Sequence, residues 1–399
     1  MKISVIGSGV QGSSIAFILA KTPGVSEIVS ADIDLNRARQ AVEKIKSDIV
    51  SAERVDASKV DDLFRVVKES DTVINATPRF NLNIMEAALK SRANYVDLAS
   101  GDGEEVEDSV QRQLAFDDKF KDAGVTAVVY QGGPFTTNVP VRYAADRLDR
   151  VDEIRLRLGW TGEEREEFIP TWSPAWSPEV ALTEWVPPAT IYENGKWKEV
   201  SPFSGVEDYP FPEPLGPATV CFIDYEPTHT LPRFIKGVKY VDYKITPDRM
   251  AGALIKIGLA SDKPIDVKGV KVAPRDVLLA LTPPASETSA KMERKGALET
   301  RGKEAYGCSL AEVKGEKTGE KITYIVYKIS SFRENYEKWG TMWAGVAVPA
   351  ALTATMLAKG EIKTKGVIPP EGLEPEPFLA KLAEKGWIFQ ERITREIRA

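Results

Sequence analysis

Short apolar runs alternate with helical patterns over the first 130 residues. Apolar side chains recur every three or four positions from Leu35 to Ile49, and this spacing predicts a helix with one buried face. Alternating strands and helices are typical of parallel β–α–β units, so this part predicts a doubly wound parallel sheet. The predicted strands are Lys2–Ile6, Glu27–Ala31, Val50–Val55, Thr72–Asn75, Tyr95–Leu98 and Val125–Val129.

From about residue 150 the pattern changes to alternating apolar and polar positions. This alternation predicts strands with one face in water, and a helix is predicted over Asp248–Leu259. We therefore expect a second, α+β domain built on a mostly antiparallel sheet. Its predicted strands are Ile154–Trp160, Val220–Tyr225, Val238–Ile245, Tyr306–Val313 and Ile322–Ile329, the last two joined as a hairpin across Lys314–Glu320.

Two other parts of the chain stand outside this pattern. Residues 161–218 are rich in Pro, Trp and Glu and show little periodicity, so we expect a long ordered excursion at a domain or subunit contact. The longest apolar stretch, Ala344–Ala358, is too short to span a bilayer and predicts a buried helix. After the proline-rich 366–377 region, a helix over Pro377–Lys385 and a strand over Trp387–Ile393 are predicted.

Composition narrows the class of protein. The 399 residues exceed one ordinary core, which favours two domains. A net charge of −6 argues against nucleic acid as a partner. The absence of an N-terminal signal pattern and the two widely spaced cysteines fit the cytoplasm. A single histidine, His229, rules out a metal site built on several His and Cys ligands, so no metal is expected.

A glycine motif follows the first predicted strand and opens a helix. Its three glycines allow a tight turn, an approach of backbone N–H groups to a pyrophosphate, and close helix–sheet packing, and the helix N-terminus favours an anion. Asp32 ends the next strand at the expected spacing. The sequence therefore predicts a Rossmann domain that binds a nicotinamide dinucleotide through Gly7, Ser8, Gly9, Val10, Gln11 and Gly12.

The residues after the second strand predict which dinucleotide is favoured. A carboxylate at Asp32, followed by Ile33, accepts hydrogen bonds from ribose hydroxyls and repels a 2′-phosphate, which predicts NAD. Arg37, one helical turn further on, leaves NADP as the alternative. Two more loops at strand ends are expected along the cofactor: Asp56 and Ala57 near the adenine, and Asn75, Ala76, Thr77 and Pro78 near the nicotinamide ribose.

These residues resemble the saccharopine dehydrogenase and lysine 6-dehydrogenase family of amino-acid oxidoreductases. The resemblance rests on the glycine motif with Gln11 before its last glycine, and on segments 31–34, 73–78, 95–98, 132–138, 230–233 and 366–371. It runs through most of the chain in order, and its first third is the most specific part. Pro134-Phe135 departs from the Pro-Gly usual in the family, which leaves the substrate open more than the cofactor.

The resemblance implies oxidation at a carbon that bears nitrogen, or the reverse reductive condensation, with imine hydrolysis. It also implies a Rossmann domain over 1–131, a substrate and dimerisation domain over 132–343, and a C-terminal segment over 344–399 that returns to the Rossmann domain. The helix Ala344–Ala358 and the last strand are expected to be part of that return.

Few residues are candidates for the substrate pocket. Asp97, at the end of the fifth strand, would hold an ammonium or relay a proton; a turn-capping aspartate is the alternative. His229 is a catalytic candidate because it is the only side chain whose ordinary pKa lies near neutrality; a structural or exposed histidine is the alternative. Arg79 and Arg233 would bind a carboxylate of the substrate; solvated surface arginines are the alternative. Trp172 and Ser173 would line the pocket, with packing in the core as the alternative. Asn138 is added to the predicted pocket by the resemblance.

Three hypotheses for function remain open at this point. The first is an NAD(P)-dependent oxidoreductase acting on the C–N bond of an amino acid such as saccharopine or lysine. The second keeps the fold and takes a polyamine-type amine or carboxyamine. The third is a dinucleotide-binding regulator without turnover, which a pocket filled by tryptophan would favour. A homodimer is expected from the 161–218 segment and from the resemblance.

Overall fold

Seven parallel strands form the first sheet of the computed structural model, which describes residues 1–102, 105–133, 135–161, 172–174, 176–285, 287–288, 299–300 and 303–396. The strand order is β19-β6-β5-β4-β1-β2-β3, so the predicted Rossmann sheet is confirmed. The order reverses between β1 and β4. The strands are β1 (Lys2–Ile6), β2 (Glu27–Asp32), β3 (Val50–Arg54), β4 (Thr72–Asn75), β5 (Asn94–Asp97), β6 (Thr126–Val128) and β19 (Gly366–Ile368).

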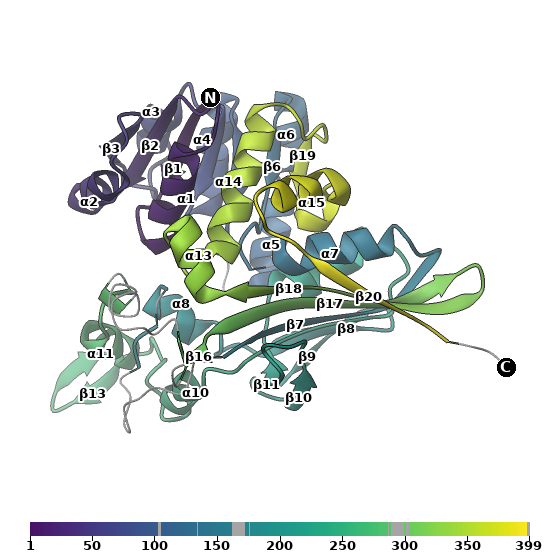
Figure 1. Ribbon diagram of the computed structural model, residues 1–399. Coiled ribbons are helices and arrows are strands. Elements are labelled where there is room, and N and C mark those ends of the chain that lie inside the picture. The colour runs from purple at the N-terminus through teal and green to yellow at the C-terminus, as the bar shows by residue number, and fades with distance from the viewer. Residues whose placement is uncertain are drawn as a thin grey trace.

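Helices cover both faces of this sheet (Figure 1). One face packs on α1 (Val10–Ala20), α2 (Leu35–Ile45) and α14 (Ala344–Ala358). The other packs on α3 (Val60–Val67), α4 (Asn81–Ser91), α5 (Val106–Leu114) and α6 (Asp117–Ala123). Strands buried on both faces explain the continuous apolar runs in the sequence.

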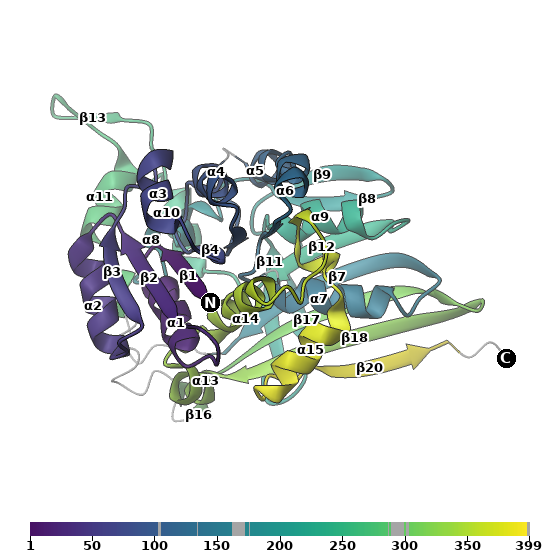
Figure 2. The ribbon, with the colours of Figure 1, turned by 90° about the horizontal axis from the view of Figure 1, so that it is seen from above.

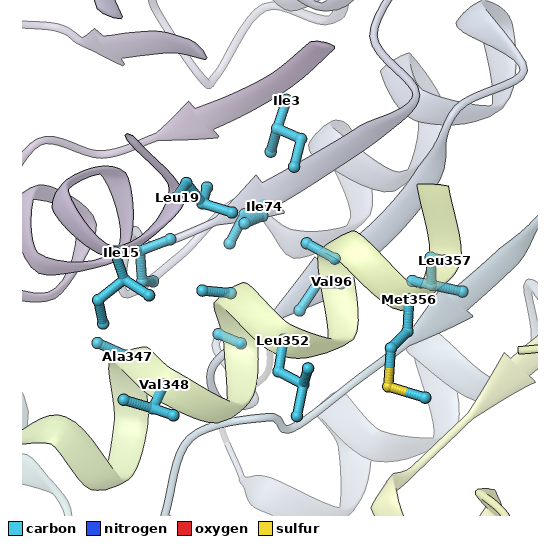
Figure 3. Close-up of a cluster of buried hydrophobic side chains, with 14 of the residues drawn as sticks. Ile3, Ile15, Leu19, Ile74, Val96, Ala347, Val348, Leu352, Met356 and Leu357 are labelled. Atoms are coloured by element: carbon cyan, nitrogen blue, oxygen red, sulfur yellow. The ribbon is translucent and has the colours of Figure 1, made fainter. Parts of the chain in front are cut away.

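The C-terminal helix α14 lies in the centre of the Rossmann core. Figure 3 shows Ala347 of α14 beside Ile15 of α1, and Val348 and Leu352 belong to the same buried cluster. The helix is apolar on all sides, as a helix enclosed by other elements must be. Next along the chain, β19 adds a seventh strand beside β6. The sequence did not predict β19, because three residues between a polar segment and Pro369 are too short to show periodicity.

The second sheet has nine strands, of which only β12 and β7 pair in parallel. The predicted, mostly antiparallel sheet is therefore confirmed. Its members are β7 (Arg150–Trp160), β8 (Ala189–Glu193), β9 (Lys196–Val200), β10 (Glu207–Pro210), β11 (Pro217–Phe222), β12 (Tyr240–Ile245), β17 (Tyr306–Lys317), β18 (Glu320–Ser331) and β20 (Gln390–Arg395). Short pairs are β13 (Ile265–Val267) with β14 (Val270–Val272), and β15 (Glu299–Thr300) with β16 (Lys303–Glu304).

The remaining helices connect or cover this sheet. Figure 2 shows α7 between α14 and the long strands β17 and β18. The helices are α7 (Phe135–Ala145), α8 (Pro178–Thr183), α9 (Glu226–Phe234), α10 (Arg249–Lys256), α11 (Pro274–Leu281), α13 (Phe332–Trp339) and α15 (Pro375–Glu384), with a 3₁₀ turn η1 (Pro370–Gly372). Of the described helices none alone is long and apolar enough to cross a membrane; only α13 and α14 reach that length together, bent by 41°.

Several expectations needed correction. The hairpin turn is only Thr318-Gly319, both at positive φ, so β17 and β18 extend through the polar segment expected to be a loop. The last strand, β20, pairs with β18 in the second sheet and not with the Rossmann domain. In the 161–218 excursion, α8, β8, β9 and β10 form regular structure, while residues 162–171 and 175 lie outside the described part. The domain limits 1–131, 132–343 and 344–399 stay a prediction.

Candidate active site

A cleft of about 2400 Å³ lies between the carboxyl ends of the Rossmann strands and the second domain. The loops after β1 to β6 line one side of it, and β7, β12, α8 and the α9 N-terminus line the other. Ligands of open α/β sheets bind at this edge, where the strand order reverses. The two domains thus enclose the region in which the sequence predicts a cofactor.

The glycine loop combines close packing with open space. A Cβ on Gly12 would lie 1.8 Å from the carbonyl oxygen of Gly7, and Gly7 itself has φ +99° against Ala76. A Cβ on Gly9 would meet nothing within 4 Å. No side chain caps the first turn of α1, so its backbone N–H groups are left for a ligand. This cradle fits the pyrophosphate of a dinucleotide.

Asp32 is buried at the end of β2 and organises the loops around it. Its Oδ2 accepts a hydrogen bond from Ser8 N at 2.9 Å, and its Oδ1 accepts one from Asp34 N at 3.0 Å. Arg37 Nη1 lies 3.7 Å from Oδ1. The carboxylate is therefore fixed at the cleft, where ribose hydroxyls would reach it. The flanking predicted residues Val10, Gln11, Ile33, Asp56 and Ala57 also line the cleft.

The loop after β4 reaches the cleft through Ala76, Thr77 and Pro78. Asn75 supports this loop from behind: its Oδ1 accepts hydrogen bonds from Thr77 N at 2.9 Å and Thr77 Oγ1 at 2.7 Å. Asn75 is buried and is not part of the described cleft lining, so its role is to hold the loop.

Asp97 lies behind the wall of the cleft, which revises its predicted contact with substrate. The side chain is 0% exposed, and its carboxylate accepts hydrogen bonds from Gln113 Nε2, Asn81 Nδ2 and Tyr130 N. Burial raises the pKa of Asp97 to about 7. The carboxylate ties the end of β5 to its neighbours, closer to the alternative of a turn-capping residue.

His229 and Arg233 are bound to carboxylates and do not line the described cleft. His229 Nδ1 lies 2.8 Å from Glu107 Oε2, and its Nε2 lies 2.9 Å from Asp224 Oδ1. Arg233 donates to both oxygens of Glu107. Burial would lower the pKa of His229, but these hydrogen bonds raise it to about 9. The group, which we name the α5–α9 clamp (Glu107, Asp224, His229, Arg233), joins the two domains.

Arg79 and Asn138 are also occupied by protein partners. Arg79, beside the β4 loop, forms an ion pair with Glu179 of α8 across the cleft. Asn138 Nδ2 donates to Glu371 Oε2 at 2.7 Å in the interior. Neither side chain is part of the described cleft lining. Trp172 and Ser173, by contrast, line the cleft, and Trp172 Nε1 donates to Asp248 Oδ2 at 2.9 Å; their contact with substrate stays a prediction.

Three carboxylates that the sequence did not single out line the substrate half of the cleft: Glu184, Glu226 and Asp248. Burial raises the pKa of Glu184 to about 7, against a hydrogen bond donated by Tyr225 Oη at 2.8 Å. Burial also raises the pKa of Glu226. Pro227 in the first turn of α9 is the one sequence signal that marks this helix start. It does not indicate that Glu226 turns into the cleft.

Aromatic rings enclose these carboxylates. The described lining includes Trp160, Trp172, Trp176, Trp185, Tyr225, Tyr243 and Trp343. Trp176 meets Trp343 edge to face with ring centroids 5.5 Å apart, so the two sides of the cleft touch there. Carboxylates and aromatic faces both attract cations. Among the described residues no three His, Cys, Asp or Glu side chains converge as a metal site would require.

Two family models and several proteins of known function are similar to this chain. Residues 3–128 match the model of the saccharopine dehydrogenase NADP binding domain, and residues 122–387 match that of the saccharopine dehydrogenase C-terminal domain. The chain is similar to carboxyaminopropylagmatine dehydrogenase from Synechocystis sp., with 26% identity over 98% of this chain and 97% of the relative. It is also similar to carboxynorspermidine synthase from Vibrio cholerae, with 27% identity over 97% and 95%.

Two solved structures share the fold. Saccharopine dehydrogenase (L-Glu forming) from Saccharomyces cerevisiae superposes with a TM-score of 0.70 at 16% identity, covering 98% of this chain and 99% of that one. Homospermidine synthase from Legionella pneumophila, in complex with NAD, gives a TM-score of 0.66 at 13% identity, covering 98% and 91%. At these identities the likeness concerns the fold.

Proposed function

The chain belongs to the saccharopine dehydrogenase family of NAD(P)-dependent oxidoreductases, and within that family we propose that its substrate is a polyamine-type amine rather than saccharopine or lysine. The reaction is oxidation of a carbon bonded to nitrogen, followed by hydrolysis of the imine, or the reverse condensation. The amino-acid substrate expected first from the sequence is therefore replaced by the second hypothesis.

The charge of the substrate half of the cleft carries this proposal. The described lining of this half contains three carboxylates, Glu184, Glu226 and Asp248, and one basic side chain, Arg249. Saccharopine has three carboxylates, which would require guanidinium or ammonium partners. A polyamine has several ammonium groups, which carboxylates and tryptophan faces stabilise. The lining therefore favours a substrate with more positive than negative groups.

The similar proteins support the same choice. Their names specify carboxyaminopropylagmatine and carboxynorspermidine, which are polyamines that carry a carboxyl group. Arg249 at the start of α10 would take that carboxyl, and Glu184 would hold an ammonium at the distal end. The open volume beside Trp172 and Trp176 argues against a regulator whose pocket is filled by tryptophan.

For the cofactor we propose the cradle Gly7–Gly12 for the pyrophosphate, Asp32 for the ribose, and Ala76–Pro78 for the nicotinamide end. Bound there, the dinucleotide accepts or returns the hydride. Asp32 favours NAD, with NADP as the alternative. The two free, buried cysteines, Cys221 and Cys308, agree with a cytoplasmic location, and we expect a homodimer.

The test is a spectrophotometric screen for NADH and NADPH formation. Carboxynorspermidine and carboxyaminopropylagmatine are compared with saccharopine and lysine at equal concentration. We expect turnover of the carboxylated polyamines, and a higher KM for them in Glu184→Gln. Turnover of saccharopine alone would overturn the substrate assignment. Dinucleotide binding without turnover of any of the four would favour the regulator.

A further inference from the structure

Glu226 occupies a particular place in the cleft. It is the first residue of α9, it is 3% exposed, and it lines the cleft. Its Oε1 accepts hydrogen bonds from Ser100 N at 2.6 Å and Ser100 Oγ at 2.8 Å. Ser100 follows Ala99, which lines the cleft at the end of β5. A residue of the second domain is thereby held against the nicotinamide end of the Rossmann sheet.

The other cleft carboxylates are placed differently. Both oxygens of Asp248 are occupied, by Trp172 Nε1 at 2.9 Å and Ala251 N at 2.8 Å, so it serves as the cap of α10. Glu184 binds Tyr225 and lies on the α8 side with Trp185. Ser100 donates both of its hydrogen bonds to Oε1, and apart from the backbone N–H of Glu226 itself no described residue donates one to Oε2. Glu226 is therefore the carboxylate that combines a fixed position beside β5 with a free oxygen.

We propose that Glu226 is the catalytic residue that removes the proton from the reacting amine and returns it to the leaving amine. This inference rests on the proposed function, since it assigns the proton transfers of that reaction. A carboxylate buried in a partly apolar cleft suits both transfers. Burial raises its pKa from the usual acidic range towards neutral pH, so it can both accept and donate a proton there. Asp97, the candidate from the sequence, cannot reach the cleft from its buried position.

The carboxylate of Glu226 takes one N–H proton from the secondary ammonium R–CH₂–NH₂⁺–R′, and the C–H hydrogen then leaves as hydride to NAD(P)⁺. Water adds to the resulting iminium carbon, forms the C–O bond and releases one proton to solvent. Protonated Glu226 gives its proton to nitrogen, the C–N bond breaks, and the hydroxyl proton leaves with the amine. The products are R–CHO, R′–NH₃⁺, NAD(P)H and one H⁺.

The α5–α9 clamp gives His229 and Arg233 a positioning role in this scheme. His229 lies one turn after Glu226 on α9 and bridges Asp224 to Glu107 of α5. Arg233, one turn further, binds Glu107 and stacks on Trp197 at 4.5 Å. These contacts fix α9 against the Rossmann domain. They keep the first residue of α9 in register with Ser100.

The kinetic test uses the holoenzyme with NAD and carboxynorspermidine. Glu226→Gln should lower kcat by about 10²-fold and remove the acidic limb of its pH profile, with NAD affinity unchanged by fluorescence titration. Glu184→Gln should instead raise KM, and the exposed Glu199→Gln serves as the matched control. Should Glu226→Gln fail to fold, Glu226→Asp, which withdraws the carboxylate, should lower kcat. A variant of Glu226 with the wild-type kcat overturns the assignment.

A binding test separates this inference from the proposed function. Norspermidine is titrated calorimetrically into cofactor-free protein at about pH 6 in two buffers of different ionisation enthalpy. The wild type should release protons as its buried carboxyls take up ammonium groups, and Glu226→Gln should release fewer. Equal proton release by both proteins overturns the inference. Norspermidine binding without turnover contradicts the proposed function alone, and no binding by the wild type overturns both.

Discussion

Gly9 and Gly12 stand three residues apart in one loop but have opposite surroundings. The space around Gly12 is filled by the backbone of Gly7, whereas the space around Gly9 opens into the cleft. The backbone of Gly9 is also in a conformation that any residue adopts, with φ −71°. The fold therefore requires glycine at position 12, whereas at position 9 the requirement comes from the proposed pyrophosphate site.

We therefore predict that Gly9→Val folds normally and loses dinucleotide binding, because its side chain occupies the pyrophosphate space. The measurements are circular dichroism for folding and NAD(P)H fluorescence titration for affinity. Gly12→Ala is the contrasting variant and should destabilise the protein, since its Cβ would lie 1.8 Å from the carbonyl oxygen of Gly7. A Gly9→Val protein with unchanged NAD affinity would show that this loop is not the cradle.

Asp32 provides a second prediction at the level of one residue. Asp32→Ser should raise the kcat/KM for NADP relative to NAD, because it removes both ribose hydrogen bonds and the repulsion of a 2′-phosphate. A hydrogen bond to a charged group contributes about 1.5–3 kcal/mol, which corresponds to roughly ten- to 150-fold in the ratio. A wild-type preference for NADP would mean that Arg37, 3.7 Å from Asp32, decides the choice.

On α9, the single histidine of the sequence, His229, forms a contact between the two domains. A lone histidine in the sequence suggests proton transfer near neutral pH. In the structure, its neighbours Glu107 and Asp224 keep it charged, with its pKa raised to about 9. Burial alone would raise the pKa of Glu107, but His229, Arg233 and Gln111 lower it to about 2. The element therefore stabilises the domain contact and supplies no neutral base.

This charge state predicts how stability depends on pH. Since folding raises the pKa of His229 from 6.5 to about 9, its contribution is complete below pH 6.5 and is lost as the pH rises through 9. The contribution is on the order of 3 kcal/mol. Urea unfolding at pH 6.5 and 9.5 should show a larger loss for the wild type than for His229→Asn.

The comparison of the two proteins isolates the histidine from other titrating groups. Burial lowers the pKa of Lys328 to about 8, so this lysine titrates in the same range, but equally in both proteins. The other charged members of the clamp, including Arg233, are retained in His229→Asn. Equal losses of stability in the two proteins would show that the clamp does not depend on the imidazolium.

At the scale of the whole molecule, function depends on the relative position of the two domains. The proposed cofactor cradle belongs to the Rossmann sheet, whereas Glu184 and Glu226 belong to the second domain. The cleft is bridged by Arg79 with Glu179 and by Trp176 with Trp343. A substrate can contact both cofactor and carboxylates only because these contacts and the α5–α9 clamp hold the domains together.

We also predict a homodimer, now from the apolar surface around α11 and the β13–β14 hairpin. Leu281 is 79% exposed, Ile257 73% and Val270 61%, and the described side chains of α11 include no buried one. Light scattering at micromolar concentration should give twice the chain mass, and Leu281→Glu should give the monomer. Ile388→Glu, at a site elsewhere that is 61% exposed, is the control. A wild-type monomer would contradict the prediction.

The sequence by itself determined the elements whose reasons are local. The strands β1 and β4 have the predicted bounds, and α1 begins within the glycine motif as expected, because apolar periodicity and the glycine motif depend on only a few neighbouring residues. The parallel sheet, the mainly antiparallel second sheet and the nicotinamide dinucleotide all follow from such patterns.

Only the tertiary structure decided which side chains meet. β19 and β20 lie in one C-terminal segment but join different sheets, since strand pairing depends on long-range backbone hydrogen bonds. Asp97 ends a strand at the cofactor edge and is nevertheless buried behind the cleft. Glu226 is held at the cleft because His229 of α9 binds Glu107 of α5. Glu107 lies 119 positions before Glu226 in the sequence. Burial and charge pairing arise from contacts between distant segments, and the periodicity of a single segment does not contain them.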